Sequence, residues 1–175
     1  MMEWFLAASA LILAGGLIAE ALPDRLKAGA LTLCIGLALV PLVWLALSVL
    51  IAGGSLDLVV RLGSLLGEVV LRLDPLAAFF VLLTSLGGFA ASLFAVGYVR
   101  HYLAEKRHFA FHFFFMALLL VSMLLLFVVQ IALAFLIVWE LMSLSSFMLV
   151  VFENETAEVL AAGINYLIAM HIGVV

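Results

Sequence analysis

The sequence is dominated by apolar stretches that are about as long as a membrane is thick. Six of them stand out, at residues 4–22, 28–52, 75–97, 109–129, 131–152 and 159–175. A helix rises about 1.5 Å per residue and needs about 20 residues to cross a bilayer. With 69% apolar and 10% charged residues, the chain also lies outside the composition range of soluble globular domains. We therefore expect an integral membrane protein.

The six stretches are apolar on all sides, which favours helices, because the strands of membrane barrels alternate between apolar and polar residues. The predicted fold is an all-α integral membrane protein. A single transmembrane domain over residues 1–175 would form a bundle of about six transmembrane helices. Pro41 lies inside the second stretch and is expected to kink it.

Segment 54–74 is the only substantial connection outside the predicted spans. Its two halves alternate roughly between apolar and polar residues, with Gly63 and Gly67 between them. This pattern favours a hairpin, and an amphipathic helix on the membrane surface is the alternative. Asp74 and Pro75 then predict the start of the third span, as N-cap and first helical residue.

Basic residues predict the orientation of the chain in the membrane. Five of the seven Lys and Arg residues lie in or beside the loops after the first and third spans, namely Arg25, Lys27, Arg100, Lys106 and Arg107. Because basic loops stay in the cytoplasm, we expect the N-terminus and segment 54–74 to be extracytoplasmic. The predicted location is the cell inner (cytoplasmic) membrane. Glu20 lies at the cytoplasmic end of the first span, where Arg25 or Lys27 is near enough to pair with it.

Several kinds of site are not predicted. The single cysteine, Cys34, excludes a disulfide framework, an iron–sulfur cluster and a Cys-based zinc site within this chain. No two histidines or carboxylates have metal-ligand spacing on one helix, so no metal site is expected. The formal charge of −4, without a basic patch, argues against nucleic acid as a partner. Glycine-rich phosphate loops and nucleophile elbows do not occur, so we predict no catalytic residue and no cofactor in this chain.

Glu140 is the most informative residue, because it lies near the middle of the fifth span. A charged side chain at mid-bilayer costs roughly 2.5–3.5 kcal/mol on insertion scales. A dry interior favours the protonated carboxyl group, which could then gain and lose a proton. The first interpretation is proton or cation handling. The second is a protonated carboxyl group that joins two helices by a hydrogen bond, with Ser143 as a local partner one turn away on the same face.

Two of the four histidines are further candidates for proton transfer. His112 lies about one turn inside the fourth span, where imidazole could take up protons or could simply reach the membrane interface. His171 lies deep in the last span, where a relay and a helix-to-helix hydrogen bond are both open. His101 and His108 lie in a basic loop and are interpreted as part of a solvated face.

Three segments and the end of the chain resemble a known family. They are Leu73–Phe80 (LDPLAAFF), Ser92–Tyr98 (SLFAVGY), Phe135–Val151 (FLIVWELMSLSSFMLVV) and Tyr166–Gly173 (YLIAMHIG). These segments resemble the antiporter-like membrane subunits of respiratory complex I, Mrp antiporters and hydrogenases. The form of the third and fourth segments is most similar to hydrogenase-4 component B and its formate hydrogenlyase relatives. The resemblance runs from about residue 73 to the end.

The resemblance implies two inverted five-helix repeats and proton transfer along charged residues at mid-membrane. Glu140 matches the family's glutamate in helix five, which interacts with a lysine on a broken seventh helix. His171 matches a polar position in helix six. The broken helix and the second repeat have no counterpart here, so we expect a fragment or a split product whose partner chain supplies the C-terminal helices.

The resemblance therefore implies the N-terminal part of a proton-translocating membrane subunit in a hydrogenase or NADH–quinone oxidoreductase complex. The chain itself would carry no redox centre, and whether it counts as part of an enzyme is left open. Expected partners are other membrane subunits of such a complex, protons or monovalent cations, and the lipid bilayer. The alternatives are an Mrp-like cation/proton antiporter subunit and a non-conducting membrane anchor.

Overall fold

The structure is a computed structural model that describes residues 1–61, 67–104, 111–153 and 157–172. Some predictions lie outside the described residues. They concern the turn glycine Gly63, the basic loop residues Lys106 and Arg107, and the last three residues of the predicted sixth span.

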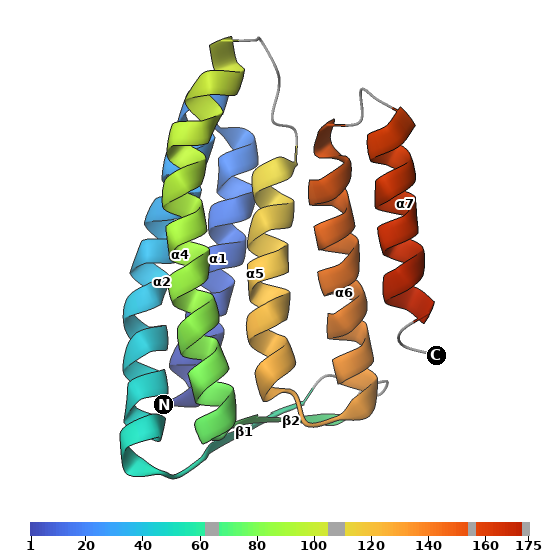
Figure 1. Cartoon of the computed structure of the whole chain (residues 1–175). Helices are drawn as coiled ribbons and strands as arrows, with labels where there is room; N and C mark the ends of the chain where they lie inside the picture. Colours follow the sequence, from blue (N-terminus) through green and yellow to red (C-terminus); the bar gives the residue numbers. More distant parts are fainter. Residues whose placement is uncertain (62–66, 105–110, 154–156, 173–175) are drawn as a thin grey trace.

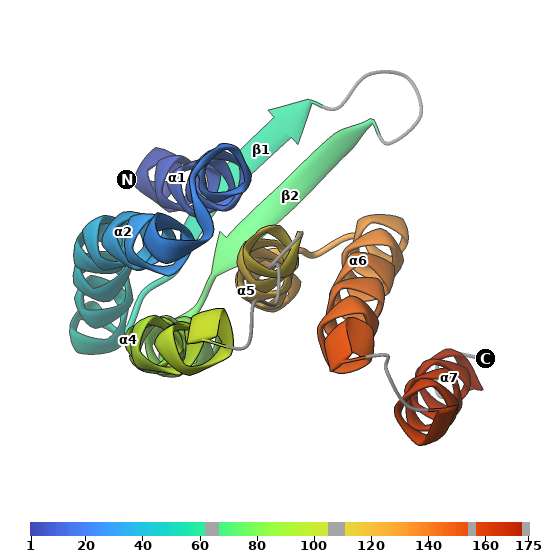
Figure 2. The ribbon, with the colours of Figure 1, turned by 90° about the horizontal axis from the view of Figure 1, so that it is seen from above.

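The described part of the chain contains six α-helices and a pair of strands, and successive helices run in opposite directions (Figure 1). Seen from above, they follow an arc that ends with α7 beside α6, away from α1, α2 and α4 (Figure 2). The elements in chain order are α1 (Met2–Ala21), α2 (Asp24–Ala52), β1 (Leu56–Arg61), β2 (Glu68–Leu73), α4 (Pro75–Ala104), α5 (His112–Val128), α6 (Ala132–Val150), the 3₁₀ turn η1 (Val151–Glu153) and α7 (Ala157–Ile172).

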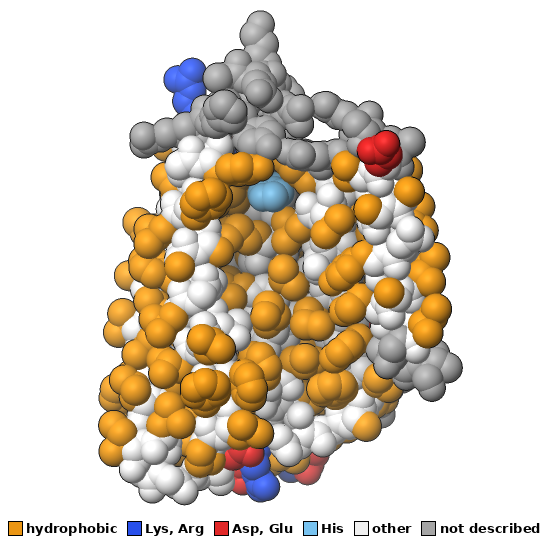
Figure 3. All heavy atoms as spheres, in the orientation of Figure 1, with side chains coloured by type: hydrophobic (Ala, Val, Ile, Leu, Met, Phe, Trp, Pro, Cys, Tyr) orange, Lys and Arg blue, Asp and Glu red, His pale blue; other side chains and the backbone are white. Residues whose placement is uncertain are grey.

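Four segments are long and apolar enough to cross a membrane by themselves: α1, α2, α4 from Pro75 to Tyr98, and α6. The apolar helices α5 and α7 are shorter. Hydrophobic side chains cover the middle of the face in Figure 3, and the coloured charged groups lie at its two ends. This arrangement agrees with an all-α membrane protein, and the count of six spans stays a prediction.

The core lies between α1, α2, α4 and α5, where large side chains such as Phe5, Leu45 and Phe113 are completely buried. Glycines let these helices approach closely. A Cβ atom at Gly16 would lie 2.6 Å from the Cβ atom of Ala117 on α5. Real Cβ atoms do not approach so closely, so only glycine fits this contact between α1 and α5.

The two strands β1 and β2 pair in antiparallel register, with Leu56 opposite Leu73 and Arg61 opposite Glu68. They lie across one end of the bundle, at the same end as the N-terminus (Figure 1). In β2 the alternate residues Val69, Leu71 and Leu73 are buried against the bundle. The outer face carries ion pairs instead, so each strand has one apolar and one charged side.

The strand pair is also tied to the helices at its inner edge. The backbone N–H of Gln130, in the connection between α5 and α6, donates to the carbonyl of Val70 at 3.0 Å. The location of this end of the bundle outside the cytoplasm stays a prediction.

Helix α4 begins as the Asp-Pro pair predicts. The N–H of Ala77 donates to the Asp74 carboxylate at 2.7 Å, and Pro75 is the first helical residue. The carboxylate satisfies one backbone donor that a helix start otherwise leaves open.

Candidate functional site

Two of the residues that the sequence singles out, Glu140 and His171, contact each other. Oε2 of Glu140 lies 2.9 Å from Nε2 of His171. Glu140 lies near the middle of α6, and His171 lies near the end of α7, which runs antiparallel to α6 (Figure 1). The contact therefore joins two apolar helices at about the middle of α6.

A second hydrogen bond sets the role of one nitrogen of the His171 ring. Its Nδ1 lies 2.8 Å from the carbonyl oxygen of Leu167. A carbonyl oxygen can only accept, so Nδ1 carries a hydrogen and donates it. Nε2 is then left to share a proton with the Glu140 carboxyl group. A hydrogen bond at one ring nitrogen sets the role of the other in this way in many histidine sites.

Two contacts between α6 and α7 fix the register of these helices. The hydroxyl groups of Tyr166 and Ser146 are 3.0 Å apart. Nearer the connection, a Cβ atom at Gly163 would lie 3.3 Å from the Phe147 ring, so the helices are close there. These contacts place Glu140 opposite His171.

The pair opens onto an apolar face. The side chains of Glu140 and His171 are 40% and 47% exposed. Their exposed neighbours on the two helices are large and apolar, including Leu136, Leu144 and Ile168. In a bilayer this face would be covered by lipid or by another protein chain, because these exposed neighbours are apolar.

Ser143 is buried, and its hydroxyl group bonds to the main chain. It lies 3.1 Å from the carbonyl oxygens of both Trp139 and Glu140. The structure therefore places this hydroxyl beside the α6 backbone rather than on the carboxyl group of Glu140.

His112 lies apart from the Glu140–His171 pair. It is the first residue of α5, and its ring centroid is 4.5 Å from that of Phe152, just beyond the end of α6. From Val150, the last residue of α6, to Glu140 the helix axis rises about 15 Å. A cavity of about 350 Å³ adjoins His112 and is also lined by Tyr98 and Phe152.

An ionic cluster lies at the same end of the bundle as His112. The buried ammonium group of Lys27 is 3.4 Å from Glu20 Oε2 and 3.2 Å from Asp24 Oδ1. Of the two predicted partners of Glu20, Arg25 and Lys27, the structure shows the pair with Lys27. Sequence reasoning did not find that Glu20 Oε2 also accepts the N–H of Phe111 at 2.9 Å, where Phe111 has a left-handed φ of 60°.

No group of three or more His, Cys, Asp or Glu side chains within the described ranges is arranged to hold a metal ion. The chemistry that the Glu140–His171 pair can perform is proton exchange. Its two heavy atoms lie within the range of about 2.6–3.2 Å at which one side chain can pass a proton to another.

The chain is similar to hydrogenase-4 component B of Escherichia coli (strain K12), with 37% identity over 106 residues. The match covers 61% of this chain and 15% of that protein, so it spans a small part of the relative's length. No protein-family model matches the chain. The similarity supports the resemblance seen in the sequence segments.

Proposed function

We propose that this chain is part of a proton-translocating membrane subunit in a hydrogenase or NADH–quinone oxidoreductase complex, and that protons pass through Glu140 and His171. The observation that carries the proposal is the 2.9 Å contact between Oε2 and Nε2 among apolar helices. The type of complex is supported by the similarity to hydrogenase-4 component B.

The pair suits proton transfer because it can hold one proton in two places. With the proton on Glu140, both side chains are neutral. With the proton on Nε2, a carboxylate faces an imidazolium, and the net charge is again zero. Transfer within the pair therefore moves no net charge into the apolar layer, where an isolated charge is expensive.

The remaining parts of the proton path are proposed from where the other residues lie in the bundle. His112 would take up protons at the cytoplasmic end of the bundle, beside the ionic cluster of Glu20 and Lys27. Ser143 would support the α6 backbone next to the relay. The family resemblance implies that a further chain segment with a lysine covers Glu140. The exposed apolar face around the pair offers room for such a segment.

The decisive experiment replaces Glu140 by Gln in the assembled complex, in inner-membrane vesicles. The matched control is Glu158→Gln, the same change in the first turn of α7. We expect proton translocation to fall about 100-fold or more with Glu140→Gln, since a positioned acid or base contributes about 10²–10⁴-fold to proton transfer. Assembly and the control variant should remain normal.

Other results would support the alternative functions. Normal pumping with Glu140→Gln would contradict the relay and favour a membrane anchor. Cation transport without an electron donor would favour an Mrp-like antiporter. An infrared difference spectrum tests the chemistry separately, because a carboxyl band that responds to proton exchange should be present in the wild type and absent in Glu140→Gln.

A further inference from the structure

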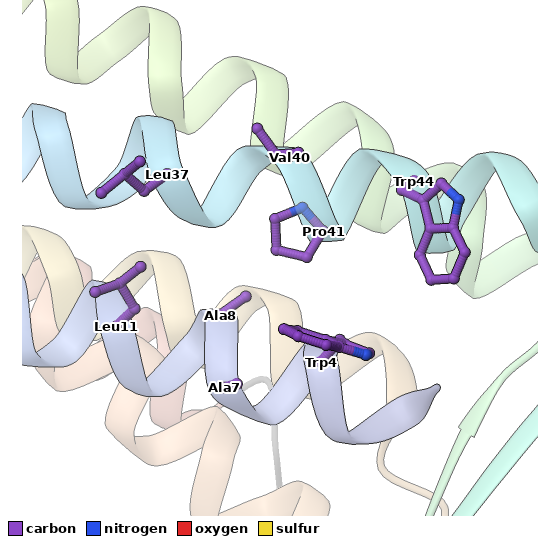
Figure 4. A pocket seen from close by; sticks show the side chains of 8 residues that line it. All are labelled: Trp4, Ala7, Ala8, Leu11, Leu37, Val40, Pro41 and Trp44. Carbon is purple, nitrogen blue, oxygen red and sulfur yellow. The ribbon is translucent and has the colours of Figure 1, made fainter.

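A groove of about 680 Å³ opens on the surface between α1 and α2 (Figure 4). The residues that shape it are Trp4, Ala7 and Leu11 on α1 and Val40, Pro41 and Trp44 on α2. None of the residues that line it is charged, and the two indole nitrogens are its only polar side-chain atoms. The volume lies within the usual range of small-molecule pockets, about 300–1,000 Å³.

The groove is closed at the end that lies away from the strands. Beyond Leu11, α1 and α2 come into direct contact, where a Cβ atom at Gly15 would lie 2.5 Å from the Cβ atom of Cys34. Packed helix axes are about 8–10 Å apart, so two touching helices leave no space for a third between them. From Trp4 to Leu11 the groove runs only about 10 Å along α1. This length suits part of a thin, flexible apolar chain better than a helix that crosses the whole membrane.

Its two tryptophans indicate the level of the membrane surface. Both rings project toward the gap between the helices at the end of the groove nearer the strands, and the indole nitrogen of Trp4 lies on the strand side of its ring (Figure 4). Trp4 and Trp44 are 60% and 52% exposed. The strands beyond them carry the ion pairs Asp57–Arg72 and Arg61–Glu68, which belong in water. Tryptophan prefers this boundary, with its apolar body in hydrocarbon and its N–H toward the headgroups.

We propose that this groove binds one acyl chain of a phospholipid from the leaflet on the side of the β1–β2 strand pair. The acyl chain would lie along Ala7, Leu11 and Pro41, and the lipid headgroup would lie at the level of the two indole N–H groups. The groove lies on α1 and α2 and not on α6 and α7, so this proposal does not depend on proton transfer.

The chain provides its own probes, because its three tryptophans are Trp4, Trp44 and Trp139. Three variants, each with two tryptophans changed to Phe, keep one probe at a time. The purified chain in detergent is titrated with a phosphatidylcholine whose acyl chains carry bromine at mid-length, which quenches nearby tryptophan. We expect Trp4 and Trp44 fluorescence to reach a plateau at one lipid per chain, whereas Trp139 fluorescence falls without a plateau. Quenching that rises alike for all three residues overturns the proposal.

A pair of substitutions tests the groove itself. Ala7→Leu enlarges a side chain that lines the groove, and Ala10→Leu adds the same side chain at an exposed position outside the groove. We expect Ala7→Leu to raise the lipid concentration for half-maximal quenching of Trp44 about tenfold, since added methylenes overfill an occupied space. Ala10→Leu should leave it unchanged. Equal midpoints for the two variants contradict the proposal, and if Ala7→Leu does not fold, the single-tryptophan titrations decide.

Discussion

Replacing Glu140 by Asp tests whether the contact with His171, rather than the mere presence of a carboxyl group, carries protons. The substitution keeps an ionisable carboxyl group but removes one methylene, and a C–C bond is about 1.5 Å long. The 2.9 Å separation from Nε2 would grow to about 4.4 Å, which is beyond hydrogen-bond range. The helices cannot simply close this gap, because the contacts of Tyr166 and Gly163 with α6 fix their register.

We expect the rate of proton translocation to fall about 100-fold in Glu140→Asp, since a misplacement of about 1 Å can cost that much in a positioned reaction. The assay is proton uptake by vesicles that contain the assembled complex, with the rate of electron transfer recorded in parallel. Glu158→Asp, with the same shortening in the first turn of α7, is the control. If Glu140→Asp pumps as many protons per electron as the wild type, at the same rate, then the Glu140–His171 contact is not part of the path.

Three further predictions concern the scaffold. Gly16→Ala should lower the free energy of unfolding by about 1–3 kcal/mol, because the added Cβ atom collides with α5. Gly29→Ala, which has open space around it, should leave the free energy of unfolding unchanged. Thermal unfolding in detergent compares the two variants. The hydrogen bond from Arg72 lowers the pKa of Asp57 from its ordinary 3.8, so the pair stabilises the strands above that pH and less as the pH falls below it. Protection factors of the strand amides should therefore drop in acid, and this change should be absent in Asp57→Asn. Asp74→Ala should weaken the start of α4 by about 1 kcal/mol, seen as faster amide exchange confined to its first turn.

Much of the fold follows from local sequence. Each predicted apolar stretch contains a helix, because in a membrane the backbone must satisfy its own hydrogen bonds. The start of α4 could be placed to the residue, since Asp74 and Pro75 act through their own side chains. The continuation of α4 to Ala104 was not predicted, because Arg100 and His101 make its end polar and composition alone suggests a loop there.

The candidate site could be predicted only one residue at a time. The depth of Glu140 and of His171 can be read from their spans, but their contact depends on which faces of α6 and α7 meet. The contact could have been predicted from how far each residue lies, in sequence, from the connection between the two helices. In two antiparallel helices, residues equally far from their connection face each other, and Glu140 and His171 lie sixteen and fifteen residues from position 156. Ser146 and Tyr166, each ten residues from it, follow the same rule.

In the proposed relay, the contact between Glu140 and His171 changes which step limits proton transfer. At mid-membrane, ionisation of a lone Glu140 would place an uncompensated charge among apolar helices, which is unfavourable, so each ionisation would be a barrier. With His171 at 2.9 Å, ionisation creates an adjacent imidazolium, and the charge that appears is compensated within the pair. The least favourable step is then the departure of the proton from the pair, because it leaves a net negative charge among apolar helices. That step requires an incoming proton or cation on the half-exposed side of Glu140 and His171. We therefore expect translocation to depend on whatever covers the apolar face of α6 and α7 in the assembled complex.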